Sequence, residues 1–161
     1  MTTRNGRSPL IGSLLLCGAT LCVALPTWAG EAAPPYVDSA LVKRWLGQGR
    51  PVTFLDVREP DEFAAGHLEG GINVVYDAVA SLVDRLPHDQ PIIVYCIHST
   101  HRAPEAAKTL QILGFTNTYV LEGGITAWQS GGQLILASDP QRAPAILPYT
   151  ERCRDKSTPK L

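Results

Sequence analysis

Residues 91–113 read PIIVYCIHSTHRAPEAAKTLQIL. The first five residues form an apolar run that predicts a buried strand, and the positions from Glu105 to Leu113 follow helical periodicity. Between the two lies a short loop that begins with Cys96 and ends with Arg102. A strand end, a tight loop and a helix start leave backbone N–H groups without intrahelical partners. Such groups can converge on an anion or on a thiolate.

Cys96 is therefore a candidate nucleophile, because backbone dipoles at this position favour the thiolate over the thiol. Arg102 adds a planar guanidinium that can pair with an oxyanion. The alternative is that a cysteine at the end of an apolar strand serves only as a small buried hydrophobe. The predicted anion-binding loop also contains Ile97, His98, Ser99, Thr100 and His101.

The segments outside this stretch alternate between strand and helix patterns. Further strands are expected near residues 36–37, 51–57, 72–74 and 118–121, and helices near residues 39–46, 60–63, 78–86 and 125–129. This alternation predicts an α/β fold with a mostly parallel central sheet and helices on both faces. Ligands of such sheets bind outside the carboxyl ends of the strands. Cys96 follows the most apolar strand at such an end.

The overall composition describes one ordinary globular domain. The chain has 161 residues, of which 45% are hydrophobic, enough for one core and too apolar for a disordered chain. The formal net charge is −1, and the basic residues are scattered rather than gathered in a stripe. No nucleic-acid partner is therefore expected.

Residues 1–29 follow the pattern of a secretory signal peptide. Arg4 and Arg7 precede an apolar run over residues 10–25, and small residues precede a cut after Ala29. The apolar run is too short for a comfortable membrane-spanning helix, although an uncleaved anchor is the alternative. We therefore expect an exported mature chain without stable membrane insertion, periplasmic if the cell is bacterial. An Ala- and Pro-rich linker, residues 30–35, follows.

Cleavage would leave two cysteines, Cys96 and Cys153. In an oxidising compartment these two could form a disulfide, or Cys153 could resolve a modified Cys96. Cys153 lies in a polar segment near the end of the chain, where a residue without a role is also expected. The sequence leaves these alternatives open.

Several short stretches resemble the rhodanese domain. They are Asp56-Val57-Arg58-Glu59, residues 66–73 (GHLEGGIN), Tyr95-Cys96 and residues 121–128 (LEGGITAW). The resemblance covers about residues 36–132 and leaves residues 133–161 as a C-terminal extension. It implies a rhodanese-like α/β fold and a sulfurtransferase activity. In that activity Cys96 takes sulfane sulfur from a donor such as thiosulfate as a persulfide, and passes it to a thiol or other thiophilic acceptor. A protein is among the candidate acceptors. No cofactor is implied.

The length of the loop differs from that of typical sulfurtransferases in this family. From Cys96 to Arg102 it spans seven residues, one more than usual, and this C-x5-R length resembles that of the family's phosphatase and arsenate reductase relatives. A wider loop could accept a tetrahedral oxyanion. A phosphatase would also need a general acid, for which His101 and Glu105 are the candidates. A cysteine-dependent phosphatase or arsenate reductase is therefore the alternative.

Two further alternatives concern side chains around the loop. Cys96, His98 and His101 offer sulfur and nitrogen donors of the kind that bind zinc or copper, so a non-catalytic metal- or protein-binding module is a third interpretation. The expectation is that the histidines line the rim and that no metal is bound. Arg58 either lines the mouth of the site or forms a structural ion pair with Glu59 or Glu62.

Overall fold

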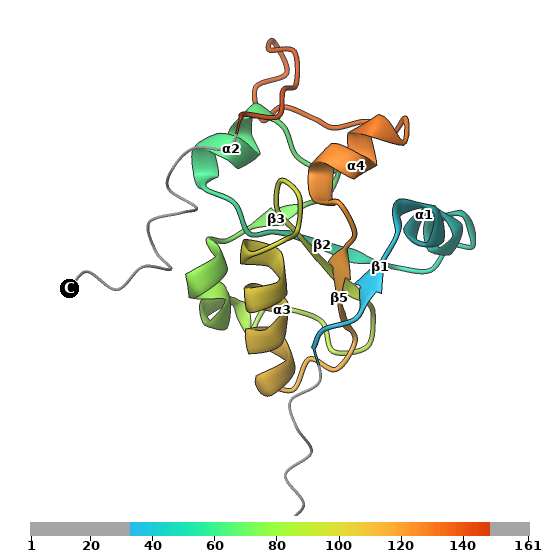
Figure 1. The fold of residues 1–161 in the computed structure, drawn as a ribbon, viewed down its shortest axis with the longest axis vertical. Helices are drawn as coiled ribbons and strands as arrows, with labels where there is room; N and C mark the ends of the chain where they lie inside the picture. The colour runs from blue at the N-terminus through green and yellow to red at the C-terminus, as the bar shows by residue number, and fades with distance from the viewer. Residues whose placement is uncertain (1–32, 149–161) are drawn as a thin grey trace, which may run out of the picture. The chain divides into compact units, whose positions relative to one another are not determined.

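The computed structural model describes residues 33–148. The predicted signal peptide and Cys153 lie outside these residues. A five-stranded parallel sheet with the strand order β1-β5-β4-β2-β3 forms the centre of the fold (Figure 1). The strands are β1 (Tyr36–Val37), β2 (Thr53–Asp56), β3 (Ile72–Asn73), β4 (Ile92–Tyr95) and β5 (Thr118–Leu121).

Helices cover both faces of the sheet. The helix α3 (Arg102–Ile112) and the 3-10 helix η1 (Tyr76–Leu82) pack on one face, where Val94 and Val120 point. The helices α1 (Ser39–Gly47) and α4 (Gly124–Ser130) pack on the other face, and the short helix α2 (Pro60–Ala65) connects β2 to β3. The predicted parallel α/β fold with helices on both faces is confirmed.

Two predicted helix boundaries are wrong. The helix expected from Glu105 begins at Arg102, because a proline such as Pro104 is tolerated in the first turn, where its missing N–H would have had no partner. The helix expected over residues 78–86 is the 3-10 helix η1, which ends at Leu82. Val79 and Leu82 are both buried, and a spacing of three residues places them on the same side of a 3-10 helix.

Residues 133–148, here called the strap, pack back onto the domain. Ile135 is buried in the core on the side of α1 and α4, and Leu136 exchanges two backbone hydrogen bonds with His67, each of 2.8 Å. Beyond this bridge the N–H groups of Ser138 and Ala145 donate to the last residues of α2, Ala64 and Ala65, at 3.0 and 2.9 Å. The strap therefore covers the C-terminal end of α2, beyond the boundary predicted at residue 132.

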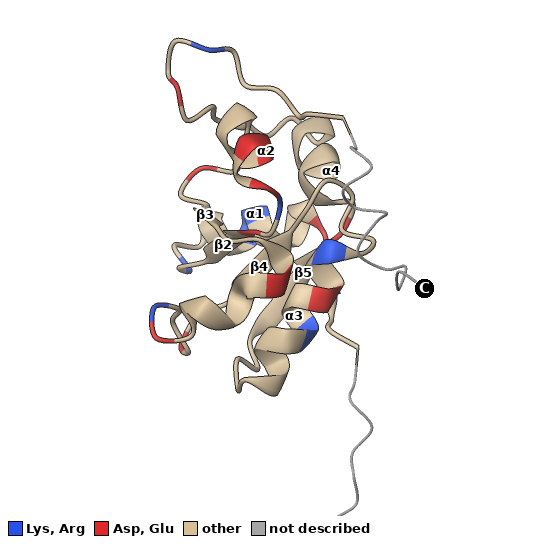
Figure 2. Cartoon of the chain, turned by 90° about the vertical axis from the view of Figure 1, so that its left-hand side faces the viewer, with Lys and Arg blue, Asp and Glu red and all other residues tan. Residues whose placement is uncertain are grey.

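The charged side chains of both signs are interspersed over the domain. Figure 2 shows acidic and basic residues alternating along α3 and around α2, without a basic stripe among the described residues of that view. Between residues 33 and 148, no helix combines the length and the apolar character needed to cross a membrane.

Candidate active site

Cys96 lies directly after β4, at the edge of the sheet where the carboxyl ends of the parallel strands meet. Its thiol forms no disulfide within residues 33–148, and its side chain is almost fully buried, as is that of the following Ile97. Cys96 belongs to the core cluster beneath α3. The chain then turns through an exposed His98, a buried Ser99 and an exposed Thr100 before α3 begins.

The first two carbonyl groups of the loop point toward the start of α4. The Cys96 carbonyl accepts a hydrogen bond from the N–H of Ile125 at 3.0 Å, and the Ile97 carbonyl accepts one from the N–H of Thr126 at 3.2 Å. Gly124 makes this approach possible, because a Cβ at its position would overlap both carbonyl oxygens. Gly124, the first residue of α4, is thus required by the geometry of the cysteine loop.

The N–H groups in the middle of the loop differ from these carbonyls in having no partner among the described residues. Within residues 33–148, none of the five N–H groups from Ile97 to His101 donates a hydrogen bond. In a planar peptide unit the N–H points opposite to the preceding carbonyl. The two carbonyls bonded to α4 therefore turn the N–H groups of Ile97 and His98 to the other side of the loop, where they can bind an anion or a thiolate.

Replacement of Gly124 by alanine is expected to disrupt this loop. Gly124 has a φ of +61°, so alanine would be strained by about 1–2 kcal/mol, and its Cβ would also push against the carbonyls of Cys96 and Ile97. We expect a loss of at least about 2 kcal/mol in the free energy of unfolding, measured by urea denaturation. Gly49→Ala is the matched control, because Gly49 has a φ of +72° but open space around it. Equal losses in both variants would contradict a steric role for Gly124.

Arg102, the last residue of the loop, is buried and forms an ion pair with Glu62 of α2. Its two terminal nitrogens contact the two carboxylate oxygens of Glu62 at 2.6 and 3.0 Å. Burial by itself would raise the pKa of Glu62, but the hydrogen bonds from Arg102 and from the Glu59 N–H, together with the positive charges of Arg102 and Arg58, outweigh it and the net pKa is lowered. In this structure Glu62 therefore balances the charge of Arg102, and the role of Arg102 in binding substrate stays a prediction.

Arg58 is fully buried and pairs with Asp56 rather than with Glu59 or Glu62. Its Nε and Nη2 donate to the Asp56 carboxylate at 2.9 and 2.6 Å, and Nη2 also donates to the carbonyl of Gly66 at 2.6 Å. Burial opposes the charge of Arg58, yet the hydrogen bond to Asp56 and the electrostatic influence of Asp56, Tyr95 and Glu62 together raise its pKa overall. The structural ion pair expected for Arg58 is therefore present, but its partner is Asp56. Asp56 and Arg58 are two residues apart in an extended segment, and side chains at that spacing lie on the same side.

The rim of the site contains one residue that the sequence reasoning missed. Tyr36, in the edge strand β1, donates a hydrogen bond from its hydroxyl to the carbonyl of Ser99 at 3.3 Å. No local sequence signal marks it, because 63 residues separate the two partners and only the pairing of β1 with β5 brings them together.

The exposed histidines of the loop do not form a metal site here. The ring of His101 lies near that of Tyr76, with 6.1 Å between the centroids. In the part of the chain that the structure describes, no three His, Cys, Asp or Glu side chains are grouped so that they could hold a metal ion. Cys96, His98 and His101 are thus not gathered as ligands.

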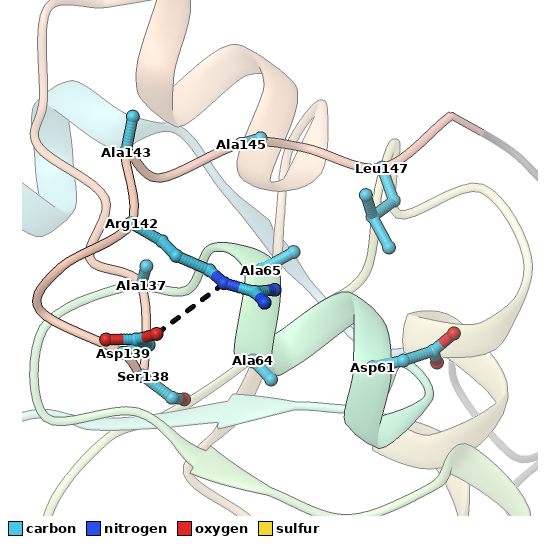
Figure 3. Close-up of a pocket in the computed structure, with 10 residues that line it drawn as sticks. All are labelled: Asp61, Ala64, Ala65, Ala137, Ser138, Asp139, Arg142, Ala143, Ala145 and Leu147. Atoms are coloured by element: carbon cyan, nitrogen blue, oxygen red, sulfur yellow. Dashed lines mark ion pairs between the residues drawn. The ribbon is translucent and has the colours of Figure 1, made fainter.

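A separate cavity of about 530 Å³ lies between α2 and the strap. Alanines make up half of the ten residues that line it. Figure 3 shows Arg142 reaching across from the strap toward α2, paired with Asp139 at 3.5 Å. None of its lining residues belongs to the loop from Cys96 to Arg102. No cysteine lines this cavity, and the candidate active site is therefore the loop that begins with Cys96.

Comparison with known proteins gives concordant relatives. The family model described as the rhodanese-like domain matches residues 38–131. YqhL of Bacillus subtilis, an uncharacterised protein, is 36% identical over 85 residues, which is 53% of this chain and 65% of YqhL. The thiosulfate sulfurtransferase GlpE of Pseudomonas aeruginosa is 34% identical over 76 residues, which is 47% of this chain and 68% of GlpE. The chain thus spans about two thirds of these relatives.

Solved structures agree with this match. The rhodanese-like domain of the Anabaena protein Alr3790 has a TM-score of 0.60 and 28% identity, covering 72% of this chain and 89% of that domain. A Rhodopseudomonas palustris protein of unknown function, described as a possible tyrosine phosphatase, has a TM-score of 0.56 and 25% identity, covering 64% of this chain and 85% of that protein.

Proposed function

The chain belongs to the rhodanese-like domain family, and we propose that it is an exported sulfurtransferase that carries sulfane sulfur on Cys96. The observation that supports this most directly is the cysteine at the carboxyl end of β4, followed by five residues, 97–101, whose N–H groups are unpaired within the described residues. The similarity to GlpE, a thiosulfate sulfurtransferase, supports a sulfurtransferase-like role.

The proposed reaction has two displacement steps. The Cys96 thiolate attacks the outer sulfur of an anionic donor such as thiosulfate, the new S–S bond forms, and sulfite leaves with the electron pair of the broken bond. An acceptor thiolate then attacks the outer sulfur of the Cys96 persulfide, and Cys96 leaves as the thiolate. The loop N–H groups stabilise the negative sulfur in each state.

A cysteine-dependent phosphatase or arsenate reductase is the second candidate. The seven-residue spacing from Cys96 to Arg102 favours it, as does the similarity to the possible tyrosine phosphatase. The ion pair of Arg102 with Glu62 does not discriminate between the donors, because thiosulfate and phosphate are both dianions that would compete with the buried carboxylate for the guanidinium. The difference lies in the enzyme-bound intermediate. Backbone dipoles alone suit a persulfide with a single negative charge better than a dianion.

The decisive experiment is the mass of the purified protein after incubation with thiosulfate. We expect an increase of about 32 Da, the mass of one sulfur atom, on Cys96 as the persulfide forms. The increase should disappear when a thiol acceptor is added. Absence of the adduct with all of several sulfane-sulfur donors, together with Cys96-dependent hydrolysis of an aryl phosphate, would establish the second candidate instead.

Export forms part of the proposal and has a test of its own. The residues of the predicted signal peptide lie outside those that the structure describes, so the support comes from the sequence pattern alone. We expect the N-terminal sequence of the mature protein to begin at Gly30. A mature protein that retains residues 1–29 would contradict cleavage.

A further inference from the structure

We propose that Tyr36 is a positioning residue that holds the cysteine loop in the form that binds a thiolate or persulfide. It does so through the carbonyl of Ser99. This inference deepens the proposed function, because it assigns a role to a residue of the edge strand in the chemistry of Cys96.

The sheet places the Tyr36 side chain on the same face as Cys96. Tyr36 lies beside Val120 in the parallel register, and Val120 lies beside Val94 of β4. Cys96 follows Val94 by two residues and shares its core cluster with both valines. Tyr36 therefore extends over the face of the sheet that carries α3, and its hydroxyl reaches Ser99 at 3.3 Å.

Ser99 is the strained point of the loop. Its φ of +54° makes it the one residue other than glycine with a positive φ in the described part of the chain. A left-handed serine costs about 1–2 kcal/mol relative to the ordinary conformation, so neighbouring contacts must hold it. The structure gives two such contacts, the bond from Tyr36 to its carbonyl and the bond from the Cys96 N–H to its Oγ at 3.4 Å.

The bond from Tyr36 also fixes the orientation of a third carbonyl of the loop, that of Ser99. Cys96 and Ile97 direct their carbonyls to α4, and Ser99 directs its carbonyl to Tyr36. Since the N–H of a peptide unit points opposite to its carbonyl, the Thr100 N–H points away from Tyr36 and has no partner within the described residues. Tyr36 thus keeps that N–H available to an anion.

The electrostatics agree with a hydroxyl close to the sulfur. Partial burial raises the pKa of Tyr36, and a negative charge on Cys96 raises it further. The hydroxyl therefore keeps its proton and remains a donor to Ser99 while Cys96 is ionised.

The test measures how fast iodoacetamide alkylates Cys96 at pH 7, followed on the tryptic peptide of residues 86–102, which contains no other cysteine. Loss of one hydrogen bond that maintains the loop should slow alkylation of the Tyr36→Phe variant about three- to tenfold. Tyr119→Phe is the matched control. Tyr119 lies in β5, its ring packs against Trp45 of α1, and its hydroxyl makes no hydrogen bond among the described residues. The alkylation rate of the Tyr119→Phe variant should stay within about twofold of wild type.

A double-mutant cycle separates positioning from general stability. Glycine adopts a positive φ without strain, so in the Ser99→Gly background the added Tyr36→Phe change should slow alkylation less than about twofold. An unchanged rate in Tyr36→Phe, or the same loss in both backgrounds, would overturn the inference. Because alkylation needs no sulfur donor, failure of thiosulfate to form a persulfide would contradict the proposed function and leave this result standing.

Discussion

Replacement of Cys96 by serine is expected to abolish persulfide formation and sulfur transfer while the fold remains intact. Serine has nearly the volume of cysteine but is a far weaker nucleophile near neutral pH, because its hydroxyl is essentially un-ionised there. Removal of a covalent nucleophile lowers turnover by roughly a thousandfold or more. The measurement is the rate of sulfite release from thiosulfate in the presence of a thiol acceptor, together with the mass of the protein.

The informative control is a cysteine that the proposed reaction does not need. Cys153→Ser should retain persulfide formation on Cys96, whereas Cys96→Ser should show no adduct at all. Circular dichroism must show the same folded content in both variants. Sulfur transfer that persists in Cys96→Ser would reject Cys96 as the sulfur carrier, and a cellular function that persists would favour an interaction role for the domain.

The strands were predictable from sequence because a parallel sheet buries both of its faces. All four residues of β2 and all four of β4 are buried, and continuous apolar runs are the pattern expected for such strands. The position of Cys96 after β4 followed from the same run. Helix starts were less predictable: Pro104 looks like a residue that precedes a helix, and only the structure shows that it lies within the first turn.

The ionic contacts of the site could not be predicted, because they depend on tertiary structure rather than on spacing. Arg102 and Glu62 are 40 residues apart, and several other carboxylates were equally plausible partners from sequence alone. The hydrogen bond from Tyr36 to Ser99 could not be predicted for the same reason. In contrast, the resemblance of the stretch at Asp56 and Arg58 to a family pattern was informative about the fold, since these two residues form a buried pair that ties the end of β2 to Gly66.

Replacement of Glu62 by alanine is expected to destabilise the protein strongly, because the variant removes the carboxylate that both terminal nitrogens of the buried Arg102 contact. Both side chains of this pair are only 5% exposed, and removal of one partner of a buried ion pair costs about 3–5 kcal/mol. Urea denaturation should therefore show a much lower midpoint for Glu62→Ala. Asp139→Ala, which removes the carboxylate of the exposed pair with Arg142, is the matched control and should change the midpoint little.

The dependence of stability on pH gives this prediction a second readout. The pKa of Glu62 is lowered from 4.5 in the folded protein, so its contribution is complete above pH 4.5 and is lost as the pH falls through the folded-state pKa. Wild type should therefore lose more stability than Glu62→Ala on acidification from pH 6 to pH 3. Replacing both partners with leucine should recover much of the loss at neutral pH, because an apolar pair leaves no buried charge. Equal acid sensitivity of wild type and Glu62→Ala, or a double variant as unstable as the single one, would mean that this ion pair does not hold α2 against the start of α3.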